Sequence, residues 1–211
     1  MSEKRKYKKP QKDASKPISG KSEIRLNRYI AGTGICSRRE ADQYISAGLV
    51  SVNGKIIRKL GTKVYPGDVV RFKGKILKDE EKVYILMNKP KDCVTTVDDP
   101  CAKKTVMDLI GKGISERIYP VGRLDRNTTG VLLLTNDGEL ALRLTHPSYN
   151  KKKIYHIFLD RDLTRSDMKR IADGIELEDG FIIPDAIQYA DENAKNQVGI
   201  ELHSGRNRIV R

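Results

Sequence analysis

Apolar residues near the start of the chain recur with a helical period. Leu26, Tyr29 and Ile30 fall on one face of a predicted helix, which two nearby glycines bring to an end. Ser37 then precedes Glu40 by three residues, the spacing of a capping box, in which each side chain bonds the other residue's backbone N–H. A second short helix is therefore expected directly after Ser37.

The next residues change to a strand pattern. Short apolar runs at 49–52 and 56–57 flank an Asn-Gly dipeptide, which is typical of a two-residue hairpin turn. A Pro-Gly-Asp sequence marks a further turn before another apolar run at 69–72. Residues 24–75 are thus predicted to form one small module in which helices precede strands.

The remainder of the chain mixes strands with short helices. Residues 76–82 are polar and charged and are expected to be a linker. An apolar run at 131–135 predicts an uninterrupted buried strand, and Asp137 is expected to cap the helix that follows. The other expected elements are helices at 139–144 and 163–171 and strands at 84–87 (ended by Asn-Lys-Pro), 154–159, 182–183, 187–190 and 198–202. The fold class is therefore α+β, with a mixed, mostly antiparallel sheet over 83–211.

The composition is that of a folded protein without a membrane segment. The 211 residues are 38% hydrophobic, and no run approaches the roughly 18–20 apolar residues of a membrane span. The N-terminus is charged but has no apolar stretch, which excludes a secretory signal. Three cysteines without C-x-x-C spacing indicate a reduced, cytoplasmic protein and provide no pattern of zinc ligands.

The formal net charge of +13 belongs to the first third of the sequence. Residues 1–23 carry 8 Lys and Arg against 3 Asp and Glu, and residues 24–75 carry 11 against 3. Residues 76–211 carry 22 of each. We therefore expect a disordered basic tail over 1–23 and a basic module that grips a polyanion, joined to a neutral body. A basic surface without a partner is the alternative.

Two arginines are expected at a helix N-terminus, where backbone N–H groups and the helix dipole also favour phosphate. These are Arg38 and Arg39, and the alternative is that they only face solvent. The tract RLNRYIAGTGICSRREADQYISAGLVSVNGK resembles the S4 RNA-binding module found in ribosomal protein S4 and in several RNA-modifying enzymes. The resemblance adds Arg25, Arg28 and Lys55 as RNA-contact candidates, and such modules recognise mainly the shape and phosphates of structured RNA.

A polar loop with an acidic residue at its centre precedes the run at 131–135. Its sequence, GRLDRNTTG, places Asp125 between Arg123 and Arg126. A carboxylate flanked by two arginines is expected to stay ionised and to be usable as a nucleophile or base. The residues alone leave open that Asp125 only braces its own loop. The sequence contains no Walker, dinucleotide-binding, zinc-protease or serine-hydrolase motif.

The extended tract GRLDRNTTGVLLLTNDGELA is similar to that of the bacterial ribosomal-RNA pseudouridine synthases of the RsuA/RluB type. KKIYHI at 152–157 and SGRNRIVR at 204–211 resemble two further motifs of that family. The resemblance implies isomerisation of a flipped uridine in a structured stem-loop of rRNA, with no cofactor or metal. Large-subunit (23S) rRNA is expected as the substrate. Small-subunit (16S) rRNA, or a non-catalytic role in rRNA binding or ribosome assembly, is the alternative.

The same resemblance implies roles for four residues. Asp125 is the nucleophile, attacking the sugar or the uracil ring, and Tyr155 stacks on the flipped base. Arg206 pairs with Asp125, and Arg123 fills the vacated stack or contacts phosphate. A core role for Tyr155 and a purely structural ion pair for Arg206 remain as alternatives. We also expect a monomer, and a catalytic domain over 83–211 whose C-terminal end is incomplete, because the family continues past the third motif.

Overall fold

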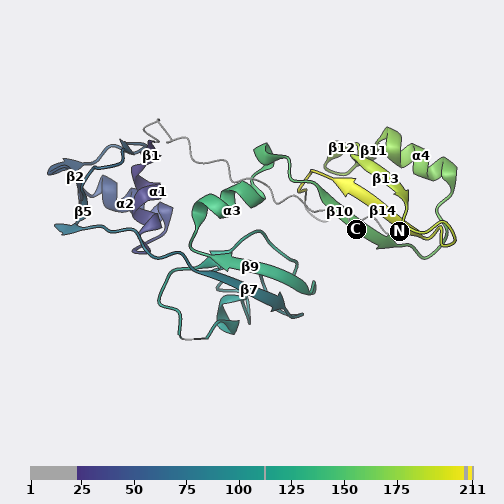
Figure 1. Ribbon diagram of the computed structural model, residues 1–211, viewed down its shortest axis with the longest axis horizontal. Coiled ribbons are helices and arrows are strands. Elements are labelled where there is room, and N and C mark those ends of the chain that lie inside the picture. The colour runs from purple at the N-terminus through teal and green to yellow at the C-terminus, as the bar shows by residue number, and fades with distance from the viewer. Residues whose placement is uncertain (1–22, 112, 207–208, 211) are drawn as a thin grey trace, which may run out of the picture. The chain divides into compact units, whose positions relative to one another are not determined.

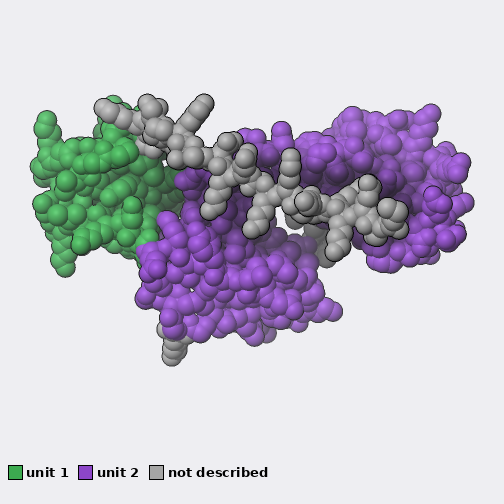
Figure 2. Space-filling model, in the orientation of Figure 1, with its two compact units in different colours: residues 1–80 green, residues 81–211 purple. Residues whose placement is uncertain are grey.

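The computed structural model describes residues 23–206, except residue 112, and residues 209–210. The chain divides into two compact units, residues 1–80 and residues 81–211 (Figure 2). Their helices and strands are labelled in Figure 1. The expected disordered tail, apart from residue 23, lies outside the described residues.

The first unit begins with two helices, α1 (Leu26–Gly32) and α2 (Arg38–Ser46). The predicted capping box is present. The backbone N–H of Glu40 donates to Ser37 Oγ over 3.2 Å, and the backbone N–H of Ser37 donates to Glu40 Oε2 over 2.6 Å. An Asn27–Asp42 side-chain hydrogen bond of 3.0 Å joins the two helices. Helix α2 is therefore fixed at its start by its own cap and at its middle by the bond to α1.

The predicted hairpin follows the helices. Strands β2 (Val50–Val52), β3 (Lys55–Ile57), β5 (Val70–Phe72) and β6 (Lys75–Ile76) form an antiparallel sheet in the order β3-β2-β5-β6. Asn53 and Gly54 both have positive φ, +49° and +82°, as a tight hairpin turn requires.

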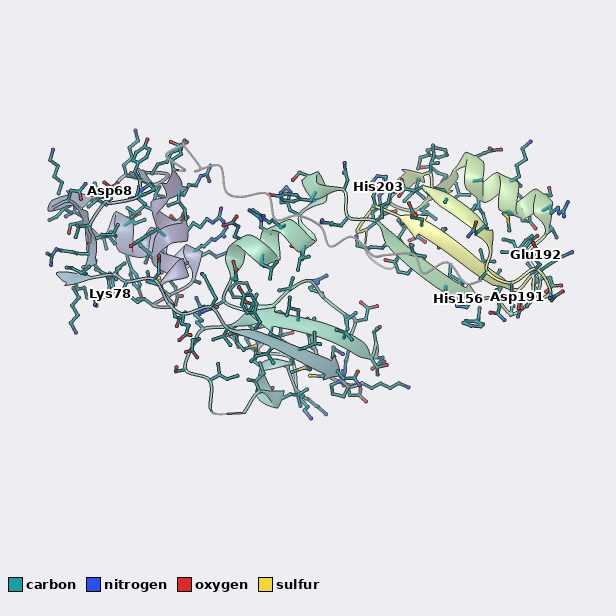
Figure 3. The ribbon with its side chains drawn as sticks, viewed as in Figure 1. Asp68, Lys78, His156, Asp191, Glu192 and His203 are labelled. Carbon is teal, nitrogen blue, oxygen red and sulfur yellow. The ribbon has the colours of Figure 1, made fainter. Side chains whose placement is uncertain are left out.

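Asp68 connects the hairpin turn to the turn that precedes β5 (Figure 3). Its carboxylate accepts hydrogen bonds from the backbone N–H of Tyr65 (2.8 Å) and from the side chain of Asn53 (2.9 Å). These donors lower the pKa of the Asp68 carboxyl group. The tip of the β2–β3 hairpin, next to Lys55, is thereby held against the rest of the sheet.

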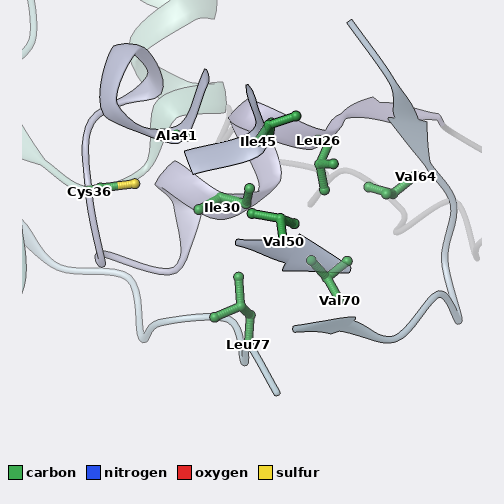
Figure 4. Packing of buried hydrophobic residues seen from close by; sticks show 9 residues of the cluster. All are labelled: Leu26, Ile30, Cys36, Ala41, Ile45, Val50, Val64, Val70 and Leu77. Atoms are coloured by element: carbon green, nitrogen blue, oxygen red, sulfur yellow. The ribbon is translucent and has the colours of Figure 1, made fainter. Parts of the chain in front are cut away.

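Two-residue strands β1 (Ile24–Arg25) and β4 (Lys63–Val64) form a separate antiparallel pair. The core of the unit gathers side chains from the two helices, from three strands and from the segments that follow α1 and β6 (Figure 4). These are Leu26, Ile30, Cys36, Ala41, Ile45, Val50, Val64, Val70 and Leu77. Leu77 is only 6% exposed. The packed unit therefore extends beyond residue 75 into the segment expected as a linker.

The second unit opens with an antiparallel sheet of order β7-β9-β8, formed by β7 (Tyr84–Lys89), β9 (Gly130–Thr135) and β8 (Tyr119–Pro120). The expectation that 131–135 is buried throughout is wrong, because Val131 is 72% exposed while Leu132 and Leu134 are buried. The core on one face is formed by Cys93, Val106, Ile118, Leu132 and Leu134. Strand β9 thus alternates between this core and the other face.

Helix α3 (Gly138–Thr145) follows β9, and short 3-10 helices occupy Met107–Leu109 and Pro147–Tyr149. The predicted cap is confirmed, since the Asp137 carboxylate accepts from the backbone N–H groups of Glu139 (3.0 Å) and Leu140 (3.1 Å). The same carboxylate accepts from the hydroxyl of Tyr84 over 2.9 Å.

A further antiparallel sheet contains β10 (Lys153–Phe158), β14 (Gln197–Leu202) and β13 (Ala186–Tyr189) in the order β10-β14-β13. Helix α4 (Arg165–Asp173) begins two residues later than expected, because Thr164 is its cap and accepts from the backbone N–H of Asp167. Strands β11 (Ile175–Leu177) and β12 (Gly180–Ile182) form a hairpin. The predicted α+β class with mostly antiparallel sheets is confirmed.

Candidate active site and RNA-binding surface

Asp125 lies on the exposed loop that connects β8 to β9. The backbone N–H of Thr128 donates to the carbonyl of Asp125 over 3.0 Å, which closes a four-residue turn that starts at the aspartate. Arg123 and Arg126 on either side are also exposed. Arg126 Nε lies 3.4 Å from Asp92 Oδ1 in an ion pair at the surface. The loop thus presents Asp125 to solvent on a defined turn.

A fully buried lysine forms hydrogen bonds with the backbone of this loop. Lys89, at the end of β7, is 0% exposed, and its Nζ donates to four backbone carbonyls. These belong to Pro90 (3.0 Å), Asp125 (3.1 Å), Arg126 (3.0 Å) and Thr128 (2.9 Å). Three of the four acceptors are therefore in the Asp125 loop, and Lys89 holds their positions.

Lys89 was not predicted as a site residue, because the strand was expected to end at Met87. Strand β7 in fact continues to Lys89, which pairs with Gly130 of β9. On this longer strand Ile85, Met87 and Lys89 point to the same side, and the first two pack against the core. The alternation that directs residues 85, 87 and 89 to the same side was the sequence signal that could have predicted a buried Lys89.

Thr95 makes a second set of bonds to the loop. Its Oγ1 donates to the carbonyl of Leu124 over 2.7 Å and accepts from the backbone N–H of the same residue over 3.3 Å. Thr95 is 6% exposed, and the side chain of Leu124 packs against the core of the sheet. The residue immediately before Asp125 is thus fixed through both its backbone and its side chain.

Tyr155 and Arg206 lie in the part of the second unit that contains the β10-β14-β13 sheet. Tyr155 is half-buried on β10 and faces Ile200 of β14 in the register. Arg206 donates to the carbonyls of Gly180 (2.8 Å) and Phe181 (3.2 Å), and its Nη1 lies 3.4 Å from Asp179 Oδ1. These contacts anchor the guanidinium to the β11–β12 hairpin, and its pairing with Asp125 stays a prediction.

An apolar cavity of about 220 Å³ lies against one face of the β10-β14-β13 sheet. Its lining includes Ile157 of β10, Val198 and Ile200 of β14, and Ile171 of α4. At the sheet edge His203 (Figure 3) bonds Asp185 through Nδ1 at 2.8 Å, next to the Lys152–Glu201 ion pair. The cavity itself is lined by aliphatic side chains and presents no reactive group.

The predicted RNA contacts all lie in the first unit. Arg25 precedes α1 and Arg28 lies within it, Arg38 and Arg39 form the first turn of α2, and Lys55 begins β3. Four of the five are exposed, and Arg28 is half-buried. Helix α2 therefore presents two arginines in its first turn, where the helix dipole also favours a phosphate.

Among the described residues, no group of three or more His, Cys, Asp or Glu side chains is placed to hold a metal ion. Within the same part of the chain, every helix is too short or too polar to cross a membrane. Cys36 and Cys93 are buried and Cys101 is exposed, and none of the three forms a disulfide.

Comparison with known proteins identifies the second unit. The family model described as RNA pseudouridylate synthase matches residues 83–211, which include the Asp125 loop, Tyr155 and Arg206. The chain belongs to this family. The enzyme also matches the model of the S4 domain over residues 24–70, which confirms the resemblance that the sequence suggested for both units.

Relatives of this synthase span most of its length. It is 44% identical over 192 residues to an uncharacterized RNA pseudouridine synthase of Aquifex aeolicus, covering 90% of this chain and 77% of the relative. Identity is 40% over 190 residues to the ribosomal large subunit pseudouridine synthase B of Bacillus subtilis, with coverages of 89% and 78%. A crystal structure of a pseudouridylate synthase matches with a TM-score of 0.54 at 27% identity, covering 89% of this chain and 80% of that one.

Proposed function

We propose that this pseudouridine synthase isomerises particular uridines of large-subunit rRNA, with Asp125 as its nucleophile. The observation that carries the proposal is the Asp125 loop, which exposes a carboxylate on a backbone held by Lys89 and Thr95. The choice of large-subunit rRNA is supported by the name of the Bacillus subtilis relative. We also propose that the enzyme acts as a monomer in the cytoplasm.

In the proposed reaction the uridine leaves its stack and Asp125 attacks its sugar or its uracil ring. The C1′–N1 bond breaks, the uracil turns over, and a C1′–C5 bond forms. The C5 proton is lost to solvent and N1 gains a proton, so the product is an isomer of the substrate. Tyr155 stacks on the flipped base, Arg206 pairs with Asp125, and Arg123 contacts phosphate or fills the vacated space.

In this proposal the first unit binds the RNA backbone. Arg25, Arg28, Arg38, Arg39 and Lys55 contact phosphates of a structured stem-loop, because an A-form major groove is too deep and narrow for side chains to read bases. The flipping of one uridine costs about a few kcal/mol, which the contacts to the surrounding RNA offset.

The decisive test is release of tritium from rRNA transcripts labelled with 5-tritiated uridine. The wild-type protein should release tritium from a 23S transcript, and Asp125→Asn should release none, because the amide has almost the same shape but is no nucleophile. Asp98→Asn is the matched control, since it makes the same change on an exposed carboxylate outside the Asp125 loop and should keep the wild-type rate.

Three results would contradict the proposal. Full activity of Asp125→Asn would make Asp125 a brace for its own loop. Release from a 16S transcript but not from a 23S transcript would reassign the substrate to the small subunit. Binding of both transcripts without any release by the wild-type protein would leave a non-catalytic RNA-binding role.

A further inference from the structure

The direction of a side chain depends in part on its own backbone, which determines where its Cβ points. For Asp125 that backbone consists of two rigid peptide planes that meet at its Cα. The first contains the carbonyl of Leu124 and the N–H of Asp125. The second contains the carbonyl of Asp125 and the N–H of Arg126. Fixing both planes fixes φ and ψ of Asp125 and limits where its carboxylate can point.

Different residues hold the two planes. The second is held at the Asp125 carbonyl by Lys89 Nζ (3.1 Å) and by the N–H of Thr128 (3.0 Å). The first is held at the Leu124 carbonyl by Thr95 Oγ1, at 2.7 Å. Because the same hydroxyl accepts from the N–H of Leu124 (3.3 Å), the plane before Leu124 is fixed as well.

Thr95 is itself firmly placed. The neighbouring Val94 donates its N–H to the carbonyl of Lys104 (3.0 Å), and its own carbonyl accepts from the N–H of Val106 (2.9 Å). Val106 is completely buried in the core of the sheet. The χ1 angle of threonine is restricted. Its hydroxyl can donate one hydrogen bond while it accepts another, and the Thr95 hydroxyl does both with the backbone of Leu124.

We propose that Thr95 is a positioning residue for the reaction, whose hydroxyl holds the backbone of Leu124 and so places the Cα from which the Asp125 carboxylate projects. This inference rests on the proposed role of Asp125 as the nucleophile. Thr95 is buried and lies 29 residues from Leu124 in the sequence, yet it would help to position the nucleophile.

The test compares three variants of the full chain in the tritium-release assay with a 23S rRNA transcript. Thr95→Val removes the hydroxyl and should lower kcat by about 10²-fold without changing KM or RNA affinity, because a misplaced reacting group costs that order of rate. Thr95→Ser restores the hydroxyl and should restore kcat. Thr96→Val is the control, since its hydroxyl bonds the carbonyl of Asp98 and not the Asp125 loop.

A second measurement is independent of activity. Hydrogen exchange of the Leu124 amide should accelerate in Thr95→Val and return to the wild-type rate in Thr95→Ser, with thermal unfolding confirming that each variant is folded. A folded Thr95→Val with wild-type kcat would overturn the proposal, as would equal loss of kcat in the valine and serine variants. If the wild type released no tritium, the proposed function would fail, and unchanged Leu124 exchange in Thr95→Val would then show separately that Thr95 does not hold the loop.

Discussion

A lysine with no exposed surface is unusual, because an ammonium group loses its hydration on burial and needs acceptors for its three N–H donors. Lys89 finds four carbonyl acceptors within 3.1 Å, three of them in the Asp125 loop. The residue therefore exchanges water for backbone carbonyl acceptors. Its contribution is to the folded loop rather than to bond making.

Lys89→Met should consequently lower the free energy of unfolding by about 3 kcal/mol, since the loop carbonyls lose a charged donor. Denaturant unfolding of the full chain measures the change. Lys91→Met removes an exposed lysine two residues away and should stay within about 0.5 kcal/mol of the wild type. Equal stability of the two variants would show that Lys89 does not support the loop.

Asp137 gives a prediction that depends on pH. Burial raises the pKa of its carboxyl group, but the N–H groups of Leu140 and Glu139 and the Tyr84 hydroxyl together have the larger effect, so the pKa lies below its ordinary value. A lowered pKa in the folded state means that the carboxylate stabilises the fold above the ordinary value of 3.8. This stabilisation is lost as the pH falls through the folded-state pKa.

Asp137→Ala should therefore cost about 1 kcal/mol at neutral pH, the usual value of an N-cap. The difference from the wild type should shrink as the pH is lowered below 3.8. Urea unfolding at a series of pH values measures it, with the exposed Asp98→Ala as the control that shows little difference at any pH. A constant difference across the series would exclude the charged cap as its source.

At the scale of elements, the sequence predicted best those features that neighbouring residues decide. The capping box of α2, the Asn-Gly hairpin and the Asp137 cap each depend on groups a few residues apart, and all three are present. The pairing of β1 with β4 was not predicted, because two-residue strands about 40 positions apart leave no periodic pattern.

The same distinction applies to the candidate site. The Asp125 loop was found because its motif is continuous in the sequence. Lys89 and Thr95 were not found, since they reach the loop across 36 and 29 residues. Contacts of that separation depend on the pairing of β7 with β9 and on the packing of the core, which no local pattern encodes.

Helix α2 provides the prediction at this scale. Arg38→Ala with Arg39→Ala should weaken rRNA binding to a similar extent for unrelated RNA sequences and should reduce the slope of log K against log salt by about 2, one for each phosphate that is no longer neutralised. Filter binding at several salt concentrations measures both. Arg165→Ala with Arg170→Ala removes two exposed arginines from α4 and should leave the slope unchanged.

At the scale of the whole molecule, charge separates the two units. Residues 1–80 carry 20 Lys and Arg against 8 Asp and Glu, whereas residues 81–211 carry 21 against 20. The first unit is therefore strongly basic, and the second, which contains the Asp125 loop, is nearly neutral. We interpret this as a division between attraction to RNA and recognition of one uncharged base.

A protein that consists of residues 81–211 alone should accordingly bind rRNA much more weakly than the full chain, with a flatter salt dependence. Titration of labelled transcript at several salt concentrations compares the two, and circular dichroism confirms that the shorter protein is folded. Equal affinity and equal salt slope would mean that the second unit, rather than the first, supplies the phosphate contacts.

The burial of Lys89 also makes its amine a reporter of motion in the Asp125 loop. An amine-reactive reagent should label the exposed Lys91 at once, but it can reach Lys89 only when the loop carbonyls release it. The labelling rate of Lys89, read by mass spectrometry against that of Lys91, therefore measures how often the loop opens. Bound RNA should slow that rate if the loop closes on its substrate, so one native lysine would report on the dynamics of the site without any added probe.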